Sequence, residues 1–110
     1  MATLEEVLQE VHAERTRQDK KWGQQNHPDG TAPDGVAKAK EVADAARKVC
    51  DYMAANKKLT WMHIFTEEVM EAFAETDELK LRTELIQSIA VGVAWVEAID
   101  RRRRARAGGE

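Results

Sequence analysis

The stretch Thr66-Glu67-Glu68-Val69-Met70-Glu71 places carboxylates inside a pattern of apolar residues with helical spacing. On a wheel of about 100° per residue, Glu68 lies near the middle of the apolar arc and Glu71 lies on its edge. A second stretch, Glu84-Leu85-Ile86-Gln87, again sets an acid and an amide three positions apart. Burying carboxylates costs free energy, so a fold that buries both stretches needs a compensating interaction.

The composition predicts a single all-α domain spanning residues 1–110. The chain has 110 residues, of which 43% are apolar and 34% are charged, and it has only 2 prolines. Such a globular composition, rich in Ala, Glu, Leu, Lys and Arg, favours helix. The formal net charge of −3 gives no overall attraction to nucleic acid or to an anionic membrane, so neither is expected as a partner.

The N-terminal sequence and the cysteine content favour a cytoplasmic location. Residues 1–10 lack the basic and apolar regions of a signal peptide, and the longest uncharged stretch, 85–96, is shorter than the ~20 residues that span a bilayer. The single cysteine, Cys50, cannot form an internal disulfide, which fits a reducing compartment. Its place on an apolar helical face predicts a buried small side chain.

Capping residues and apolar periodicity predict a four-helix, bundle-like fold. Thr3 and Glu6 have the spacing of a capping box, so the first helix is expected to begin near residue 3 and to reach Trp22. The later helices are expected over about 36–56 after an Asp34 cap, over about 61–75 after a Thr60 cap, and from about 78 into the arginine run after an Asp77 cap.

A long loop of about 14 residues is expected between the first and second helices, because Pro-Asp-Gly occurs at 28–30 and again at 33–35. Trp22 and His27 are side chains on which a nucleobase could stack or to which it could bond. The alternative for Trp22 is that it anchors the loop to the core.

Polar residues replace apolar ones in the second half of the first helix. Arg15, Gln18 and Asp19 fall on or beside its core-facing side, where a purely structural helix would keep Leu or Ala. Either these side chains serve a site, or the helix extends beyond the core and its end is solvated.

The fourth helix carries apolar residues around nearly its whole circumference between Leu85 and Val96. A homodimer, or a tetramer, would bury the second apolar face, so a homo-oligomer is expected. The residues 101–110 are expected to form a basic, frayed tail. Its arginines, Arg101 to Arg104 and Arg106, are favoured by the helix dipole, or alternatively they grip phosphates.

Carboxylates gathered in an apolar groove repel one another, and a divalent cation would compensate them. Glutamates one turn apart point the same way, and oxygen-only ligands favour Mg²⁺, with Mn²⁺ as the alternative metal. The competing interpretation is an interhelical ion-pair network in which Arg82, Arg15 or Lys20 neutralises the glutamates.

The order Glu68-x-x-Glu71, then Glu84-x-x-Gln87, resembles the E-x-x-E…E-x-x-D signature of the MazG-like nucleoside triphosphate pyrophosphohydrolases, in the all-α NTP pyrophosphatase superfamily. The resemblance covers most of the chain, including 14–23, 26–30 and 84–95. It implies a MazG-type fold and Mg²⁺-dependent cleavage between the α- and β-phosphates of an NTP or dNTP, giving a nucleoside monophosphate and pyrophosphate.

The resemblance also implies roles for individual residues. Glu68, Glu71, Glu84 and Gln87 would be metal ligands, and the catalytic candidates are Glu68 and Glu67, the latter as general base or second-sphere group. Substrate would meet Arg15, Lys20 and Lys21 at its phosphates, and Trp22 and His27 near its base or ribose.

Gln87 departs from the family pattern, which has Asp at this position. An amide oxygen can coordinate a hard cation but contributes no charge. The alternative function is therefore a catalytically impaired nucleotide-binding or interaction module on the same fold. A third possibility is a DNA-binding helical protein that uses the arginine run.

Overall fold

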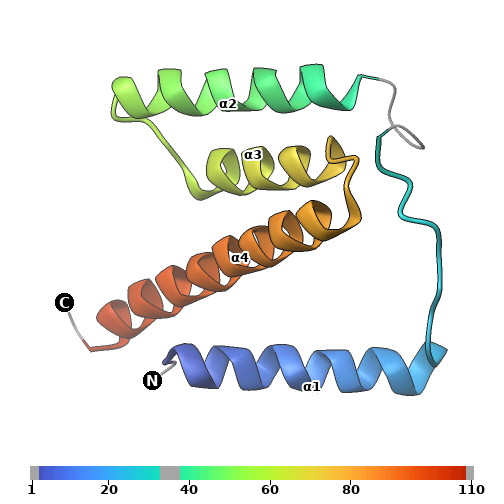
Figure 1. Cartoon of the computed structure of the whole chain (residues 1–110). Helices are drawn as coiled ribbons and strands as arrows, with labels where there is room; N and C mark the ends of the chain where they lie inside the picture. Colours follow the sequence, from blue (N-terminus) through green and yellow to red (C-terminus); the bar gives the residue numbers. More distant parts are fainter. Residues whose placement is uncertain (1–2, 33–37, 109–110) are drawn as a thin grey trace. The chain divides into compact units, whose positions relative to one another are not determined.

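A computed structural model describes residues 3–32 and 38–108 of the chain. These residues contain four α-helices and no strand (Figure 1). The helices are α1 (Leu4–Trp22), α2 (Ala39–Ala55), α3 (Trp61–Phe73) and α4 (Glu78–Ala107). The predicted all-α class is therefore confirmed, whereas the expected turn at 33–35, with its Asp34 cap, lies outside the described residues.

Three helices begin at the capping residues predicted from the sequence. The Glu6 N–H donates to Thr3 Oγ1 at 3.3 Å, and the Thr3 N–H donates to Glu6 Oε1 at 3.3 Å. In α3 the partner is His63, whose N–H donates to Thr60 Oγ1 at 3.3 Å and whose Nδ1 accepts the Thr60 N–H at 3.1 Å. Asp77 Oδ2 accepts a backbone N–H of the first turn of α4 at 2.9 Å. Local side-chain hydrogen bonds thus fix these three helix starts.

The boundaries of α2 and α3 differ slightly from the predicted ones. Helix α2 begins at Ala39, preceded by Lys38, which makes no side-chain capping bond, and it ends at Ala55. Helix α3 ends at Phe73 rather than near Glu75. The physical reason is that Glu75 Oε1 accepts the next two backbone N–H groups, at 3.0 and 3.2 Å, and so stabilises a turn instead of another helical residue.

The chain divides into two compact units, and the candidate site lies in the unit formed by residues 28–92. In this unit α2 packs along α3, and the first half of α4 lies beside α3 (Figure 1). A Cβ added to Gly92 would lie 3.4 Å from Cε1 of Phe65, so α4 approaches α3 closely here. The buried residues are mostly small: Ala39, Ala43, Cys50, Ala72, Leu81 and Ser88. Small contact residues let these helices come close together.

A backbone hydrogen bond attaches the loop before α2 to the end of α3. The Ala32 N–H donates to the Phe73 carbonyl at 3.2 Å. Gly30 has φ +71, a left-handed conformation that glycine adopts without steric cost. The segment that follows Gly30 is therefore attached to the end of α3, within the loop that the sequence predicts.

The other unit consists of residues 1–27 and 93–110, and so contains α1 and the second half of α4. Val7, from the apolar stripe predicted in the first helix, is only 2% exposed. Helix α4 continues through the arginine run to Ala107, and the Gly108 N–H closes its last turn on the Arg104 carbonyl at 2.8 Å. Over the described ranges, no helix combines the length and apolar character needed to cross a membrane.

Candidate metal centre

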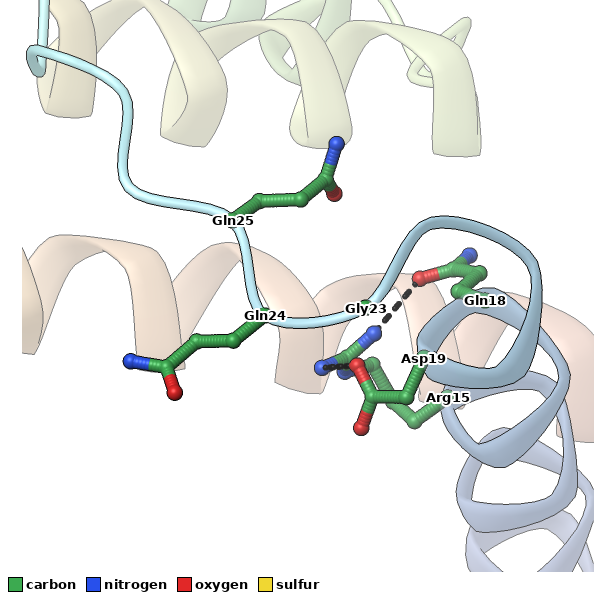
Figure 2. A pocket seen from close by; sticks show the side chains of 6 residues that line it. All are labelled: Arg15, Gln18, Asp19, Gly23, Gln24 and Gln25. Carbon is green, nitrogen blue, oxygen red and sulfur yellow. Dashed lines mark hydrogen bonds and ion pairs between the residues drawn. The ribbon is translucent and has the colours of Figure 1, made fainter.

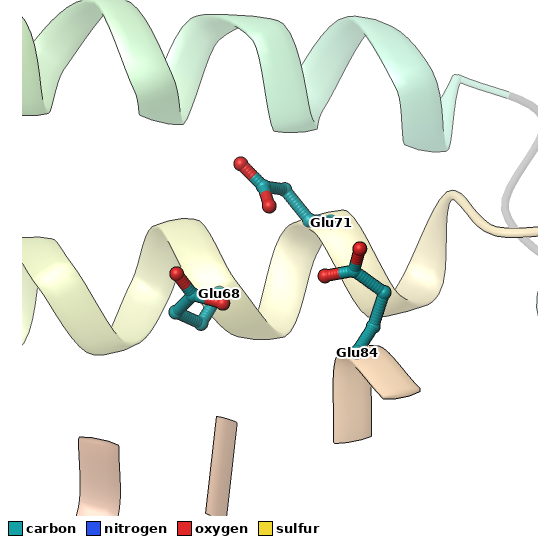
Figure 3. Close-up of side chains that lie close together, drawn as sticks. All are labelled: Glu68, Glu71 and Glu84. Atoms are coloured by element: carbon teal, nitrogen blue, oxygen red, sulfur yellow. The ribbon is translucent and has the colours of Figure 1, made fainter. Parts of the chain in front are cut away.

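Glu68 and Glu71 of α3 and Glu84 of α4 lie together (Figure 3). One carboxylate oxygen from each residue lies within 4.8 Å of the other two, and all three side chains are half-buried. Glu68 and Glu71 are three residues apart and so share one side of α3. Glu84 lies near the start of α4, in the half of that helix that runs beside α3. We call these three residues the carboxylate cluster; they are three of the four residues expected as metal ligands from the sequence.

Two members of the cluster, Glu68 and Glu71, have raised pKa values because they are partly buried and lie among other acidic groups. Burial raises the pKa of Glu68, and the charges of Glu84 and Glu67 raise it further. Burial also raises the pKa of Glu71; Glu68, Glu67 and Glu84 add to this effect, and only Arg47 opposes it. A cation bound among these oxygens would reverse both effects, because it favours the ionised carboxylates.

Two oxygens of the cluster lack hydrogen-bond partners. Oε2 of Glu68 and Oε2 of Glu84 are buried and accept no hydrogen bond from the part of the chain that the structure describes. Nearly all buried polar atoms in proteins have a partner, so each exception requires an explanation. Three neighbouring carboxylates, two of them with an oxygen that no described residue satisfies, fit a hard divalent cation such as Mg²⁺ or Mn²⁺.

Arg47 of α2 provides an interhelical ion pair that the sequence analysis did not predict. Its Nε lies 3.9 Å from Oε1 of Glu71, and its Nη1 lies 3.5 Å from Oδ1 of Asp44. Arg82, an expected partner, makes no ion pair within residues 3–32 and 38–108. One signal was available, because Arg47 is three or four positions from Ala43 and Cys50, both of which are buried on α2.

Glu67 belongs to the same helix as Glu68 and Glu71 and interacts electrostatically with both of them and with Cys50. Its charge raises the pKa of both Glu68 and Glu71. Burial, followed by the charge of Glu67 and a hydrogen bond with it, raises the pKa of Cys50 to about 11. Cys50 is 7% exposed, as predicted for a buried small residue, and its Sγ donates to the His63 carbonyl at 3.1 Å. The charge of Glu67 thus acts on the cluster, and its role as a base stays a prediction.

Gln87 follows Glu84 by three residues on α4 and is exposed. The described residues give its amide no hydrogen-bond partner, whereas the neighbouring Ser88 is buried and donates its hydroxyl to the Glu84 carbonyl at 2.9 Å. The structure therefore groups three carboxylates, and the role of Gln87 as a fourth ligand stays a prediction.

The five predicted substrate residues, Arg15, Lys20, Lys21, Trp22 and His27, all belong to the unit that contains α1. Arg15 donates to Gln18 Oε1 at 2.9 Å and to Asp19 Oδ1 at 2.8 Å (Figure 2). Arg15, Gln18 and Asp19 line an open hollow of about 550 Å³ together with residues 23–25.

The aromatic candidate Trp22 is 57% exposed, and Lys21 Nζ lies 4.7 Å from its ring centroid. His27 Nε2 lies 3.4 Å from Gln25 Nε2. Lys20 is exposed. Trp22 therefore offers an accessible ring, and the substrate roles of all five residues stay predictions.

Comparisons with models of protein families, with curated proteins and with solved structures give no match to this chain. Its class therefore rests on its own features. The described residues are all-α, and their helices α3 and α4 bring together three carboxylates, two of which have a buried oxygen that no described group satisfies.

Proposed function

We propose that this protein is a Mg²⁺-dependent nucleoside triphosphate pyrophosphohydrolase that also accepts Mn²⁺. The observation that carries the proposal is the carboxylate cluster, in which Glu68 and Glu84 each have a buried oxygen that accepts no hydrogen bond from the described part of the chain. The substrate class and a MazG-type arrangement of the helices are supported by the resemblance of the Glu68-x-x-Glu71 and Glu84-x-x-Gln87 pattern to the MazG-like signature.

Glu68, Glu71 and Glu84 would hold the metal, which when bound neutralises phosphate charge and lowers the pKa of a water molecule. The half-buried position of these residues keeps part of the solvent away, so their charges act more strongly than on an open surface. Their shared negative charge also selects a cation over other ligands. These residues therefore bind and orient the metal, whereas proton transfer requires a further group.

Glu67 is that further group. It belongs to the same helix, interacts electrostatically with Glu68 and Glu71, and can accept the proton of the attacking water. The water adds across the anhydride bond between the α- and β-phosphates, and that bond breaks. The products are a nucleoside monophosphate and pyrophosphate, and the released proton passes to Glu67 and then to solvent.

The proposed enzyme acts as a homo-oligomer, either a dimer or a tetramer. On α4, Leu85, Ile86 and Ile89 expose 42%, 52% and 53% of their surfaces. Apolar side chains in a row on one helix favour burial against a partner. A second copy of the chain would supply that partner through an interface with two-fold symmetry.

Release of pyrophosphate from a panel of ribo- and deoxynucleoside triphosphates in the presence of Mg²⁺ tests the activity. Glu68→Ala and Glu71→Ala should each lower turnover at least about 100-fold, since even partners outside the metal's first shell often contribute 10- to 100-fold. Glu41→Ala removes an exposed carboxylate from α2 and should leave turnover unchanged. Absence of turnover with every nucleotide, despite an intact helical circular dichroism spectrum, would contradict the proposed activity.

The second candidate function is a nucleotide-binding module that has lost catalysis, and the exposed position of Gln87 favours it. With only three charged ligands, the cluster would bind metal more weakly than a four-carboxylate site. Saturable nucleotide binding without hydrolysis, together with gain of turnover by Gln87→Asp, would select this candidate. Turnover by the unmodified protein would exclude it.

A further inference from the structure

Arg47 is placed to interact with either of two carboxylates on different helices. Its Nε is 3.9 Å from Oε1 of Glu71 on α3, and its Nη1 is 3.5 Å from Oδ1 of Asp44 on its own helix. Lys40 Nζ also lies 3.8 Å from Oδ2 of Asp44. The guanidinium therefore lies between a member of the carboxylate cluster and a carboxylate outside it.

The two ion pairs of Arg47 leave its side chain free to change position. That side chain is 52% exposed, and neither of its ion-pair distances is as short as the 2.8 Å between Arg15 and Asp19. Glu71 is the only cluster member that a cation of the described residues approaches, and Arg47 alone opposes the rise in its pKa. Within residues 3–32 and 38–108, Arg47 is thus the positive charge that offsets the repulsion within the cluster.

We propose that Arg47 is a resident counter-charge that releases one of its two partners: it pairs with both Glu71 and Asp44 in the metal-free protein, and it keeps only Asp44 when Glu71 coordinates a divalent cation. The inference rests on the metal site of the proposed function. Its physical basis is that a guanidinium and a divalent cation repel each other, so both cannot remain beside Glu71. Arg47 consequently stabilises the metal-free fold and lowers the affinity for metal.

Titration calorimetry with Mn²⁺ on the full chain tests this competition. Arg47→Gln should bind Mn²⁺ about tenfold more tightly than the unmodified protein, the scale of repulsion between a divalent and a single charge several ångströms apart in water. Arg47→Lys keeps the charge and should stay close to the original affinity. Arg82→Gln, which removes an exposed arginine of α4 without an ion pair in the described ranges, is the matched control and should change nothing.

The unfolding temperature tests the same proposal without a measurement of Mn²⁺ affinity. In EDTA, Arg47→Gln should unfold at a lower temperature than the unmodified protein, because the cluster has lost its counter-charge. In saturating Mn²⁺ the difference should shrink, because the metal then supplies the positive charge. If the two unfolding temperatures differ equally with and without Mn²⁺, the proposal is overturned.

Asp44→Asn tests the partner that the guanidinium keeps. This variant removes that partner and should weaken Mn²⁺ binding several-fold when Arg47 is present, but have little effect in the Arg47→Gln background. A double-mutant cycle isolates this coupling from the simple loss of a negative charge. Equal effects in both backgrounds would overturn the proposal.

The outcomes separate this inference from the proposed function. If the unmodified protein binds Mn²⁺ but Arg47→Gln binds it equally well or more weakly, Arg47 does not compete with metal, and the proposed function still stands. If the unmodified protein binds no Mn²⁺ while its fold is intact, the metal site is wrong, and both proposals are overturned.

Discussion

The acidic side chains in the second half of α1 are paired with arginines, whereas those of the carboxylate cluster lie mainly beside one another. On α1, Arg17 lies 2.6 Å from Glu14, and Arg15 lies 2.8 Å from Asp19, so each acid has a partner within one helical turn. In the cluster the acids come from two helices, and the single ion pair, to Arg47, is 3.9 Å long. The pKa of Glu14 is lowered by a hydrogen bond and by the charge of Arg17, whereas the pKa of Glu68 is raised by burial and by its acidic neighbours.

The two regions therefore differ in how their charges affect stability: the pairs on α1 stabilise the fold slightly, whereas the cluster destabilises it. Exposed pairs within one helix form wherever spacing allows, and each contributes about 0–1 kcal/mol. Half-buried carboxylates without partners weaken the fold, because the ionised form loses hydration and gains nothing in return. A bound cation would remove this cost. The proposed function therefore rests on the cluster and not on the pairs on α1.

The largest expected effect on stability comes from neutralising a half-buried charge of the cluster. Glu68→Gln should raise the free energy of unfolding of the metal-free protein by about 1 kcal/mol, because an amide loses less hydration on burial than a carboxylate. Urea unfolding in EDTA measures this, with Glu41→Gln as the exposed control. A less stable Glu68→Gln protein in EDTA would mean that the carboxylate is satisfied after all, and the comparison with α1 would fail.

A smaller effect is expected from pH, with opposite signs in the two regions. Glu68 and Glu71 have folded pKa values above the ordinary 4.5, so the folded protein holds protons that the unfolded chain releases. Stability should therefore fall as pH rises from 4.5 through the raised values, and then level off. Glu14 has a lowered pKa, so its contribution is present above 4.5 and is lost as pH falls through the lowered value.

Urea midpoints collected in EDTA across this pH range test the assignment. The fall in stability with rising pH should be shallower in Glu68→Gln than in the unmodified protein, because one of the two responsible groups no longer titrates. Glu14→Gln should leave that fall unchanged. Equal slopes for Glu68→Gln and the unmodified protein would show that the cluster does not titrate above its ordinary range.

The smallest effect is expected from breaking a pair on α1. Arg15→Gln should change the free energy of unfolding by no more than about 0.5 kcal/mol, since exposed pairs within a helix are weak. High salt should abolish even this difference, because it screens exposed charges. A change as large as that of Glu68→Gln, measured by the same urea method, would show that the α1 charges serve more than their local pairing.

The starts of α1, α3 and α4 and the shared side of Glu68 and Glu71 could be predicted because they depend on short sequence spacings. Thr3, Thr60 and Asp77 cap through residues about three positions away, so the sequence contains both partners of each cap. Glu68 and Glu71 share a face for the same reason. The positions of α2 and α3 ends were less predictable, because a side chain such as Glu75 can end a helix by bonding to either of two backbone groups.

Arg47 could not be assigned to Glu71 from the sequence because the pair depends on how α2 slides along α3. That register depends on the packing of small buried residues such as Ala43, Cys50 and Ala72. The sequence alone is compatible with more than one register of such residues. The bond between the Ala32 N–H and the Phe73 carbonyl is similar, since backbone groups carry no sequence signal. The substrate roles of the residues on and after α1 stay predictions for the same reason.

The position of Cys50 makes the motion of one helix pair measurable. Its Sγ is held against the His63 carbonyl, and a pKa of about 11 keeps the thiol protonated and unreactive at neutral pH. A thiol reagent can then react only during moments when α2 separates from α3, so the labelling rate counts those openings. Because the chain has 1 cysteine, the colour released by the reagent comes from this place alone, and the lifetime of the closed pair can be timed in solution.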